Sequence, residues 1–473
     1  MRTVSPAPER YLSGTIARFV RDCRVDGLPG RLIAIARQHL LDTIGCCLAA
    51  KDLDTSKDLA AWLAAEGGAE QATAIGVSRR LPAPQAAFVN GLLARSLEYD
   101  DMAMPDLHPS GVIVPVVLAI GEWQDTAGAE LLTAIVLGLE LCIRIGRAGY
   151  DADTRTSRFL QRGQAASAIC GAVAGAAVAA RLLGLDAGGI ADAMGIAVSL
   201  ASGSLEANRS GGTIKRFQSG WAAKSAIQAA CLAKAGVDGP VQAFEGRYGF
   251  YRCFLDGAFD PVMLGEELGR RWEVCSLRFK PYPSNYYTHA GIDAALALAR
   301  RGLKPEQVQS GELAVAAPML RTMGEPLARK QAPQSAYEAK FSGPYTGASA
   351  MIGGTSLGLG IDDFTDALVR EPRRAALMRH ITIVADPRCD AVFPDQAPAV
   401  LTVVTAAGEQ LSEAVMVNRG GTDRPLDDSE LAAKFIDCAK RAMPADVAGS
   451  LRRAIEELPG GSAAVIAELA RAA

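Results

Sequence analysis

The residues Glu98–His108, which we call the acidic loop, combine the residue types best suited to proton-transfer chemistry in this chain. Four carboxylic acids and one of only four histidines fall within these eleven positions: Glu98, Asp100, Asp101, Asp106 and His108. An imidazole titrates near neutral pH and a neighbouring carboxylate can orient it, so this set fits general acid–base catalysis. The alternative is a solvated connector whose aspartates cap a helix. The charge pattern alone leaves both interpretations open.

Both flanks of the acidic loop are apolar and helix-like, with AAFVNGLLARSL before it and VIVPVVLAIGEW after it. Met104-Pro105 and His108-Pro109 disfavour helix at the residue before each proline. We therefore expect a short irregular link between two buried helices. Charge held on a loop between rigid apolar elements marks a candidate functional site.

The composition is that of a globular chain, with 49% hydrophobic residues and a formal net charge of -3. This charge gives no support for nucleic-acid binding. The N-terminal MRTVSPAPER lacks the apolar core of a signal peptide, and the longest uncharged run, 164–180, is too weakly apolar to span a bilayer. We expect a cytoplasmic protein that does not cross a membrane.

Ten cysteines are scattered along the chain without a CxxC, and the four histidines form no HxxxH or HExxH. These spacings exclude the common zinc and iron–sulfur signatures. In a cytosolic chain, such cysteines are mostly small buried residues. We expect no metal site and no cofactor.

Hydrophobic periodicity predicts a mainly α fold. Helical spacing covers most of the first 270 residues, in segments rich in Ala and Gly that permit close helix packing: 10–25, 29–50, 55–65, 127–147, 164–183 and 188–201. After Trp272 an alternating pattern predicts strands, at WEVCSLRFKPYP and at 311–317, 380–385, 399–404 and 414–417. We expect an all-helical domain over 1–270, a smaller α+β domain over 271–426, and C-terminal helices over 427–473.

The segment LEANRSGGTIKRFQSGW is a second candidate for binding chemistry. Its glycine-rich backbone is expected to open a helix near Phe217, which places Lys215 and Arg216 at the helix N-terminus. The main-chain N–H groups there already favour an anion, and two cations add to this. A carboxylate or phosphate would suit the position, and a basic loop that faces water is the alternative.

Two further motifs are interpreted as coincidental. Asp100-Asp101 with Asp106, and Asp362-Asp363 with Asp366, resemble the aspartate-rich motifs of magnesium–diphosphate chemistry. Prolines interrupt the first motif, and the second follows a glycine where an aspartate is a natural N-cap. Residues 354–358 match the GxSxG nucleophile elbow but lack the preceding strand, so we interpret them as a turn between helices.

The chain resembles the MmgE/PrpD family, which includes 2-methylcitrate dehydratase, cis-aconitate decarboxylase and iminodisuccinate epimerase. The matching stretches run nearly end to end: LLDTIGCCLAA, AAFVNGLLARSLEYDD, HPSGVIVPVVLAIGE, IKRFQSGWAAKSAIQAACLAKAGVDGP, FEGRYGF, FKPYPSNYYTHAGIDAA, AKFSGPYTGASAMI and PLDDSELAAKF. The resemblance implies a helical domain built from both chain ends, a smaller α+β lid, a cleft between them, and a homodimer. It also implies metal-independent lyase or isomerase chemistry on a small di- or tricarboxylate.

Position by position, the resemblance assigns active-site roles to residues of four of these stretches: His108, Lys215, Lys280 and Tyr345. This sequence departs from the family at three places. Glu98 stands where the family often has Asp, Met102 where it has Thr, and Asn285 where the decarboxylase-type members have His. The loss of that histidine argues against cis-aconitate decarboxylation and leaves dehydration or epimerisation.

Removal of a proton next to a carboxylate generates a dianion that preorganised cations must stabilise. We expect Lys215 and Lys280 to bind substrate carboxylates and His108 to be the general base or acid. Glu98 or Asp101 would orient the imidazole, and Tyr345 would donate a proton. For each of these residues, a structural ion pair or a satisfied buried polar group is the alternative.

The predicted function is therefore a 2-methylcitrate dehydratase-like hydro-lyase. The residues predicted to contact the substrate besides the catalytic ones are Glu98, Asp101, Arg216 and Asn285. An epimerase of an iminodisuccinate-like dicarboxylate is one alternative. A catalytically silent protein that binds polycarboxylates is the other, since Met102 and Asn285 replace family residues.

Overall fold

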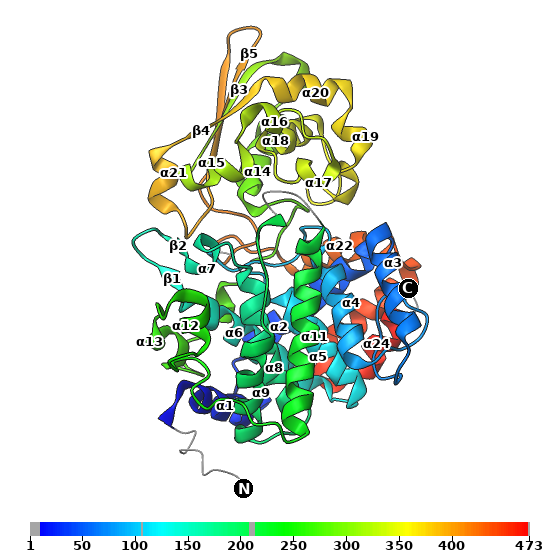
Figure 1. Ribbon diagram of the computed structural model, residues 1–473. Coiled ribbons are helices and arrows are strands. Elements are labelled where there is room, and N and C mark those ends of the chain that lie inside the picture. The colour runs from blue at the N-terminus through cyan, green and yellow to red at the C-terminus, as the bar shows by residue number, and fades with distance from the viewer. Residues whose placement is uncertain (1–9, 106, 208–212, 472–473) are drawn as a thin grey trace. The chain divides into compact units, whose positions relative to one another are not determined.

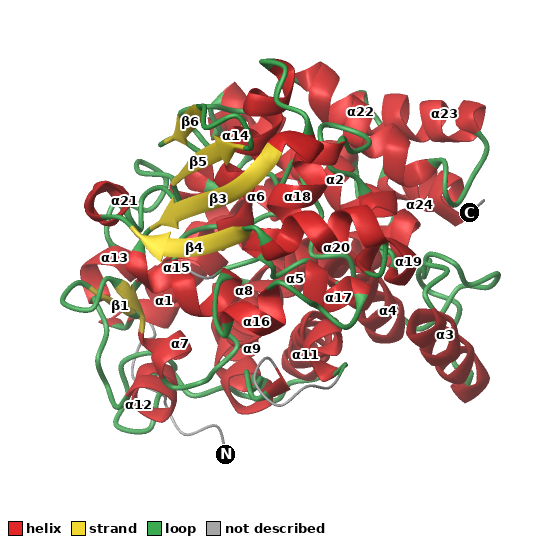
Figure 2. Cartoon of the chain, turned by 90° about the horizontal axis from the view of Figure 1, so that it is seen from above, coloured by secondary structure: helices red, strands yellow, loops and turns green. Residues whose placement is uncertain are grey.

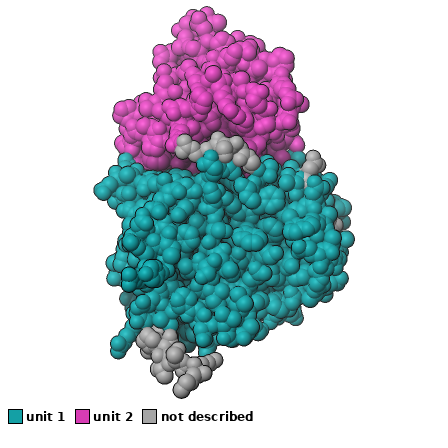
Figure 3. Space-filling view, viewed as in Figure 1, with its two compact units in different colours: residues 1–96, 100–277, 435–473 teal, residues 97–99, 278–434 magenta. Residues whose placement is uncertain are grey.

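The computed structural model describes residues 10–105, 107–207 and 213–471, and Asp106 therefore lies outside the described residues. The chain divides into two compact units, which Figure 3 colours separately. Unit 1 comprises residues 1–96, 100–277 and 435–473, and unit 2 comprises residues 97–99 and 278–434. The mainly α fold with a smaller α+β part, predicted from the sequence, is confirmed.

Unit 1 is built almost entirely from helices (Figure 1). Those before the boundary with unit 2 are α1 (Leu12–Asp22), α2 (Gly30–Ala50), α3 (Asp54–Glu66), α4 (Ala83–Arg95), α5 (Ser110–Trp123), α6 (Gly128–Arg147), α7 (Arg158–Gln161), α8 (Ala166–Leu182), α9 (Ala187–Leu200), α11 (Ile214–Lys234), α12 (Phe250–Leu255) and α13 (Pro261–Gly265). The C-terminal segment adds α23 (Ala445–Glu456) and α24 (Ala463–Arg471), and α22 (Asp428–Ala439) contains the boundary between the units.

Small residues let the central helices of unit 1 approach closely, as the sequence predicts. Helix α8 packs against α5, α6, α9 and α11, and α11 also packs against α4. A Cβ atom on Gly91 of α4 would lie 2.8 Å from the Cα atom of Gly220 in α11, so no larger side chain fits at this crossing. A Cβ atom on Gly175 of α8 would lie 2.9 Å from that of Ala226 in α11. These contacts bring two helices, α4 and α8, into close contact with α11.

Among the described helices, α2 is long and apolar enough to cross a membrane by length and composition. Two thirds of its most apolar window is buried inside the protein, which is the usual state of a core helix.

Two local predictions for the first 277 residues are wrong. Unit 1 contains a short hairpin of β1 (Tyr150–Asp151) and β2 (Thr156–Ser157), although the sequence pattern predicts no strand in the first 270 residues beyond a short one at 72–77. The alternating stretch after Trp272 forms a 3₁₀ turn, η3 (Glu273–Ser276), instead of a strand. The main-chain N–H of Val274 donates to Glu140 Oε2 at 2.8 Å, so a side chain of α6 takes the place of a strand partner. The alternation of apolar and polar residues in this stretch therefore reflects the burial of single side chains.

Unit 2 contains a four-stranded sheet in the order β4–β3–β5–β6 (Figure 2). The strands are β3 (Val308–Val315), β4 (Ile381–Ala385), β5 (Ala399–Thr405) and β6 (Gln410–Val415). Strands β3 and β4 are parallel and the other pairs antiparallel, with Leu313 opposite both Ile383 and Leu401. Helix α14 (His289–Arg300) packs on β5 and β6, and α18 (Gly343–Ile352) packs on α14 and β4.

Short helices complete unit 2: α15 (Ala317–Met323), α16 (Leu327–Lys330), α17 (Ala336–Ala339), α19 (Asp366–Val369), α20 (Pro372–Arg379), α21 (Pro387–Val392) and the 3₁₀ turns η4 (Tyr286–Thr288), η5 (Pro305–Gln307) and η6 (Ile361–Asp363). The strands at 381–385 and 399–405 lie where the alternating pattern predicts them. Strand β6 begins at Gln410, four residues before the predicted start.

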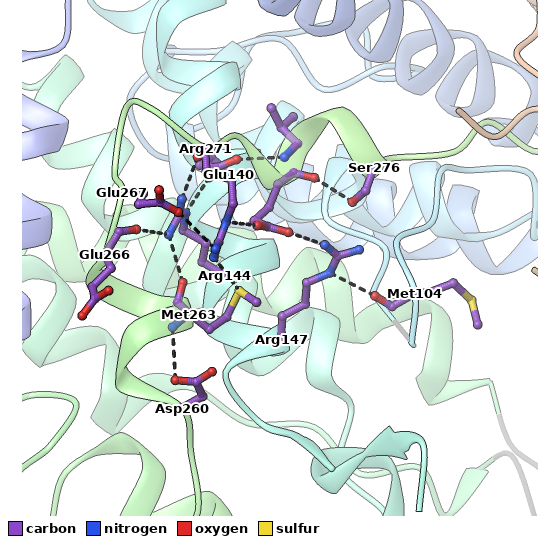
Figure 4. Close-up of polar contacts among 12 residues, drawn as sticks. Met104, Glu140, Arg144, Arg147, Asp260, Met263, Glu266, Glu267, Arg271 and Ser276 are labelled. Carbon is purple, nitrogen blue, oxygen red and sulfur yellow. Dashed lines mark hydrogen bonds and ion pairs between the residues drawn. The ribbon is translucent and has the colours of Figure 1, made fainter. Parts of the chain in front are cut away.

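A buried polar network joins α6 to the segment that follows α12 (Figure 4). Arg144, fully buried, forms an ion pair with Glu140 and donates to the carbonyls of Met263, Glu266 and Arg271 at 2.9, 2.8 and 2.7 Å. One turn later, Arg147 forms an ion pair with Glu273 and donates through Nε to the carbonyl of Met104 at 3.3 Å. The C-terminal end of α6 therefore holds one carbonyl of the acidic loop.

We expect Arg144→Leu to lower the free energy of unfolding by about 3–5 kcal/mol, because it leaves the Glu140 carboxylate buried without its partner. Chemical denaturation of both proteins measures the change. Arg162→Leu is the control, because Arg162 forms an exposed ion pair with Asp256, and its removal should cost less than about 1 kcal/mol. Equal losses in the two variants would contradict a structural role for the network.

Candidate active site

His108 is held at its Nδ1 atom, on the loop between α4 and α5. Nδ1 lies 2.6 Å from the carbonyl oxygen of Asp101, and the main-chain N–H of His108 donates to Ser167 Oγ at 2.9 Å. A carbonyl oxygen can only accept, so Nδ1 carries the hydrogen and Nε2 carries the lone pair of the neutral ring. The side chain is 14% exposed. This tautomer presents Nε2 as the basic atom of the imidazole.

Asp100 places a carboxylate beside the same ring. Its Oδ2 atom lies 3.4 Å from His108 Nδ1 and also forms an ion pair with Arg95, the last residue of α4. The Asp100 side chain is 1% exposed and that of Arg95 is 9% exposed. An ion pair buried to this degree keeps the carboxylate charged, because the neutral acid would leave the guanidinium without its partner.

The neighbouring carboxyl group of Asp101 differs from that of Asp100 in its protonation state. Burial, and then the charge of Asp100, raise the pKa of Asp101 to about 8. Ser110 donates to this carboxyl group from both its main-chain N–H and its hydroxyl, and His39 Nδ1 lies 3.5 Å from its Oδ2 atom. Asp101 is therefore protonated at neutral pH. It orients His108 through its carbonyl oxygen rather than through charge.

Two helices of unit 1, α5 and α8, begin close to His108. The residue after Pro109 starts α5, and Ser167, which accepts the hydrogen bond from His108, lies in the first turn of α8. The main-chain N–H of Ala165 donates to Gly203 O, and Gln218 of α11 donates to Ser204 O at 2.5 Å. The segment around Ser204 thus connects the start of α8 with the N-terminal part of α11. Their free N–H groups and dipoles favour an anion in this region.

Lys215 and Arg216 lie in the first turn of α11, because the helix begins at Ile214, three residues earlier than predicted. Both side chains are half-buried. Ser219, one turn after Lys215, has its Oγ atom 3.8 Å from the Cβ position of Gly111 in α5. Residues four apart share a helix face, so Lys215 lies on the face of α11 that is turned toward the start of α5. In unit 1, His108 and Asp101 thus lie together just before α5, and Lys215 lies in the first turn of α11.

In unit 2, Glu98 and Lys280 form a buried ion pair. Lys280 Nζ lies 3.6 Å from Glu98 Oε2 and donates to the Glu98 carbonyl at 3.2 Å. Two more buried lysines bind the neighbouring carbonyls: Lys340 donates to Leu97 O at 2.6 Å, and Lys434 donates to Tyr99 O at 2.8 Å. Glu98 itself has a φ of 55°, in the left-handed region that non-glycine residues seldom adopt. Three ammonium groups therefore hold three consecutive peptide units in place.

The other two predicted site residues of unit 2 make structural contacts. Asn285 accepts a hydrogen bond from the Tyr287 main chain at 3.1 Å and caps η4. Tyr345 is fully buried, and its hydroxyl donates to the carbonyl of Asp363 at 2.6 Å. Burial raises the pKa of Tyr345 to about 12. These contacts fix both side chains, and the roles in catalysis and binding assigned to them by the resemblance stay predictions.

The second aspartate motif holds a turn together. Asp363 Oδ2 accepts from the main chain of Thr355 and Gly360 at 2.8 and 2.7 Å and from the Thr355 hydroxyl at 2.8 Å. These bonds close the 354–360 turn between α18 and η6, so the GxSxG match lies in a turn, as predicted. Among the described residues, no group of three or more His, Cys, Asp and Glu side chains is placed to hold a metal ion.

The sequence interpretation did not assign a role to several polar residues of these clusters: Arg95, Asp100, His39, Lys340 and Lys434. Asp100 was noticed as part of the acidic loop, but the sequence does not distinguish it from Asp101. Arg95 ends an apolar helix that is otherwise free of charge, and a charged residue at such a position was a usable signal. Nothing in the sequence connects Lys340 or Lys434 with residues 97–99, which lie more than 200 positions away.

Two family models match the chain. The MmgE/PrpD N-terminal domain matches residues 14–261, and the MmgE/PrpD C-terminal domain matches residues 282–458.

Curated relatives match over most of the chain. Cis-aconitate decarboxylase of Homo sapiens is 26% identical over 462 residues, which cover 95% of this chain and 92% of the human protein. The cis-aconitate decarboxylase-like protein oryM of Aspergillus oryzae is 26% identical over 455 residues, 92% of each chain. Cis-aconitate decarboxylase of Aspergillus terreus is 28% identical over 302 residues, 61% of this chain and 60% of the fungal protein.

We expect Asp101→Asn to remove a pH dependence from the stability of the protein. Folding raises the pKa of Asp101 from 3.8 to about 8, so the folded state holds a proton that the unfolded chain has already released in this range. The free energy of unfolding of the wild type should therefore fall with rising pH by about 1.4 kcal/mol per unit between roughly pH 4 and pH 8, relative to that of the variant.

Urea denaturation at pH 5, 6, 7 and 8 measures this difference. Asp125→Asn is the matched control, since Asp125 lies in an exposed turn with a φ of 49° that asparagine also tolerates. Its stability should parallel that of the wild type. If the stability of Asp101→Asn also changes with pH in parallel with that of the wild type, the carboxyl group of Asp101 is ionised in the folded protein.

Proposed function

The chain belongs to the MmgE/PrpD family, as its sequence motifs indicate, and from this premise we propose that it is a lyase acting on a small di- or tricarboxylate. One observation carries the proposal: the imidazole of His108 is fixed in the tautomer with a basic Nε2 atom, where α5 and α8 begin. A base at this position meets a carboxylate substrate in a region whose dipoles favour anions. The curated relatives with decarboxylase names support the same class of substrate.

In the proposed reaction, Nε2 of His108 removes a proton from the carbon next to a carboxylate. The developing negative charge spreads onto that carboxylate, which the N–H groups at the helix starts and the ammonium group of Lys215 stabilise. Arg216 lies in the same helical turn and is proposed to bind a further carboxylate. Substitutions in the NMR assay described below test the contributions predicted for Lys280, Glu98, Asn285 and Tyr345.

Departure of the hydroxyl group from the neighbouring carbon, with a proton supplied by the imidazolium of His108 or by Tyr345, would release water and complete a 2-methylcitrate dehydratase-like reaction, which is our first candidate. Decarboxylation is the second candidate, because several curated relatives are cis-aconitate decarboxylases. Asn285 argues against it, since the resemblance places a histidine there in decarboxylase-type members. An iminodisuccinate-like epimerase would use the same first step and return the proton to the opposite face.

Proton NMR in heavy water with methylcitrate, citrate, cis-aconitate and iminodisuccinate separates these reactions. Dehydration gives an alkene, and decarboxylation gives a shorter acid and carbon dioxide. Epimerisation gives the other stereoisomer with deuterium at the carbon that was inverted. Binding without deuterium exchange for every substrate would contradict an enzymatic function and favour a protein that only binds polycarboxylates.

We expect His108→Ala to lower the turnover of the accepted substrate at least about 100-fold, the lower end of what a general acid or base contributes. His380→Ala is the matched control, because His380 is exposed and lies in unit 2 after α20. It should keep the rate of the wild type. Full activity of His108→Ala in the heavy-water assay would remove His108 from the mechanism.

A further inference from the structure

Asp100 and Asp101 are adjacent in the chain and equally buried, but their surroundings leave Asp100 negative and Asp101 neutral. Asp101 accepts hydrogen bonds from Ser110 and lies near Asp100, a like charge. Asp100 instead faces a cation, the guanidinium of Arg95, and its Oδ2 atom lies 3.4 Å from His108 Nδ1. Asp100 is therefore the carboxylate that faces the imidazole with its charge retained.

Among the described residues, the helices around the loop bring one further carboxyl group to this region, the buried Asp42 of α2, whose charge acts on Asp101. From α4 comes Arg95, and from α2 come His39, near Asp101, and Cys47, whose thiol donates to Asn90 O. Arg147 of α6 binds the Met104 carbonyl, and α8 contributes the Ser167 hydroxyl. The first turn of α11 adds the cations Lys215 and Arg216. Within the described residues, these contacts leave Asp100 as the negative charge nearest to Nδ1.

The start of α5 is shaped so that Arg95 can reach Asp100. Gly111 lies in the first turn of α5, and a Cβ atom there would be 3.0 Å from both Cγ and Cδ of Arg95. Such a contact is closer than packed carbon atoms normally allow. The glycine thus leaves room for the arginine stem to pass from α4 to the acidic loop. Arg95 and Asp100 are therefore held together by the packing of two helices as well as by their charges.

We propose that Asp100, held by Arg95, is a positioning residue for His108. The Asp101 carbonyl fixes the tautomer of the ring, and the Asp100 carboxylate stabilises the imidazolium that forms when Nε2 has taken a proton. The two functions, orientation and charge, are thus divided between adjacent residues. The proposal rests on the proposed function of His108 as the general base, and it assigns the charged partner of that base.

The four histidines of the chain make the test direct. Protein labelled with ¹⁵N-histidine gives four pairs of ring signals, and the spectrum of His108→Gln identifies the pair that belongs to His108. We expect Asp100→Asn to move the midpoint of the His108 titration to lower pH by about one unit, because an adjacent carboxylate favours the charged ring. The neutral ring should keep its hydrogen on Nδ1, since the Asp101 carbonyl is unchanged. Asp125→Asn, the exposed control, should leave the titration in place.

In the substrate assay, Asp100→Asn should lower kcat roughly 10- to 100-fold while KM changes much less, because the general base is weakened and substrate binding is not. An unchanged His108 titration in Asp100→Asn would overturn the proposal, whatever the activity. Failure of the proposed function is a separate result, because it shows as an absence of exchange in the wild type and does not affect the NMR titration.

Asp100→Asn leaves the Arg95 guanidinium buried without its carboxylate, and this variant could fail to fold. The double variant Arg95→Gln/Asp100→Asn removes both charges and avoids that penalty. We expect it to move the His108 midpoint in the same direction but by less, because the repulsion from Arg95 is also lost. A midpoint equal to that of the wild type in the folded double variant would also overturn the proposal.

Discussion

An ionised carboxylate cannot be buried without a partner, and this constraint determines the structure of the acidic loop. Glu98, Asp100 and Asp101 are 3%, 1% and 1% exposed. Each of them meets the constraint in a different way. Glu98 pairs with Lys280 and Asp100 pairs with Arg95, whereas Asp101 takes up a proton and becomes neutral. Three acids within four positions therefore acquire three different electrostatic roles, although their sequence neighbourhood is the same.

The close packing of small residues makes this arrangement possible. Gly91 and Gly220 bring α4 and α11 together, and Gly111 leaves room for the stem of Arg95 between α4 and α5. Larger side chains at these positions would separate the helices and move the first turns of α5 and α11 apart. A set of helix starts attracts an anion only when the N–H groups lie close to a common point. The alanine- and glycine-rich composition is thus directly related to the chemistry proposed for unit 1.

Much of the fold, and the family, could be predicted from the sequence. The helical periodicity of residues 128–147 and the strands at 381–385 and 399–405 are local patterns, and the structure contains these elements close to the expected bounds. The family motifs identified the family. The stretch after Trp272 was wrongly predicted as a strand, because its alternation arises from contacts with α6 rather than with a neighbouring strand. Local pattern cannot distinguish these two origins of alternation.

The roles of the individual acids in the acidic loop could not be predicted from the sequence, for a different reason. The sequence shows that acids lie near His108, but the choice between Asp100 and Asp101 depends on where Arg95 and Ser110 direct their hydrogen-bond donors. Those directions follow from the packing of α4 against α5, which no spacing rule describes. The same is true of Lys340 and Lys434, whose partners are main-chain carbonyls far away in the chain. A charged side chain that binds a carbonyl leaves no complementary charge in the sequence by which it could be found.

These carbonyl contacts explain how the residue before Asp100 is fixed. The carbonyls of Leu97, Glu98 and Tyr99 each accept from a different buried lysine, and Glu98 adopts a left-handed backbone. A non-glycine residue keeps such a conformation only when its surroundings determine it more than once. Asp100 follows directly and is held at its side chain by Arg95. Within unit 1, its carboxylate is thus fixed by this ion pair, and a group that must stabilise a transient imidazolium requires such a fixed position.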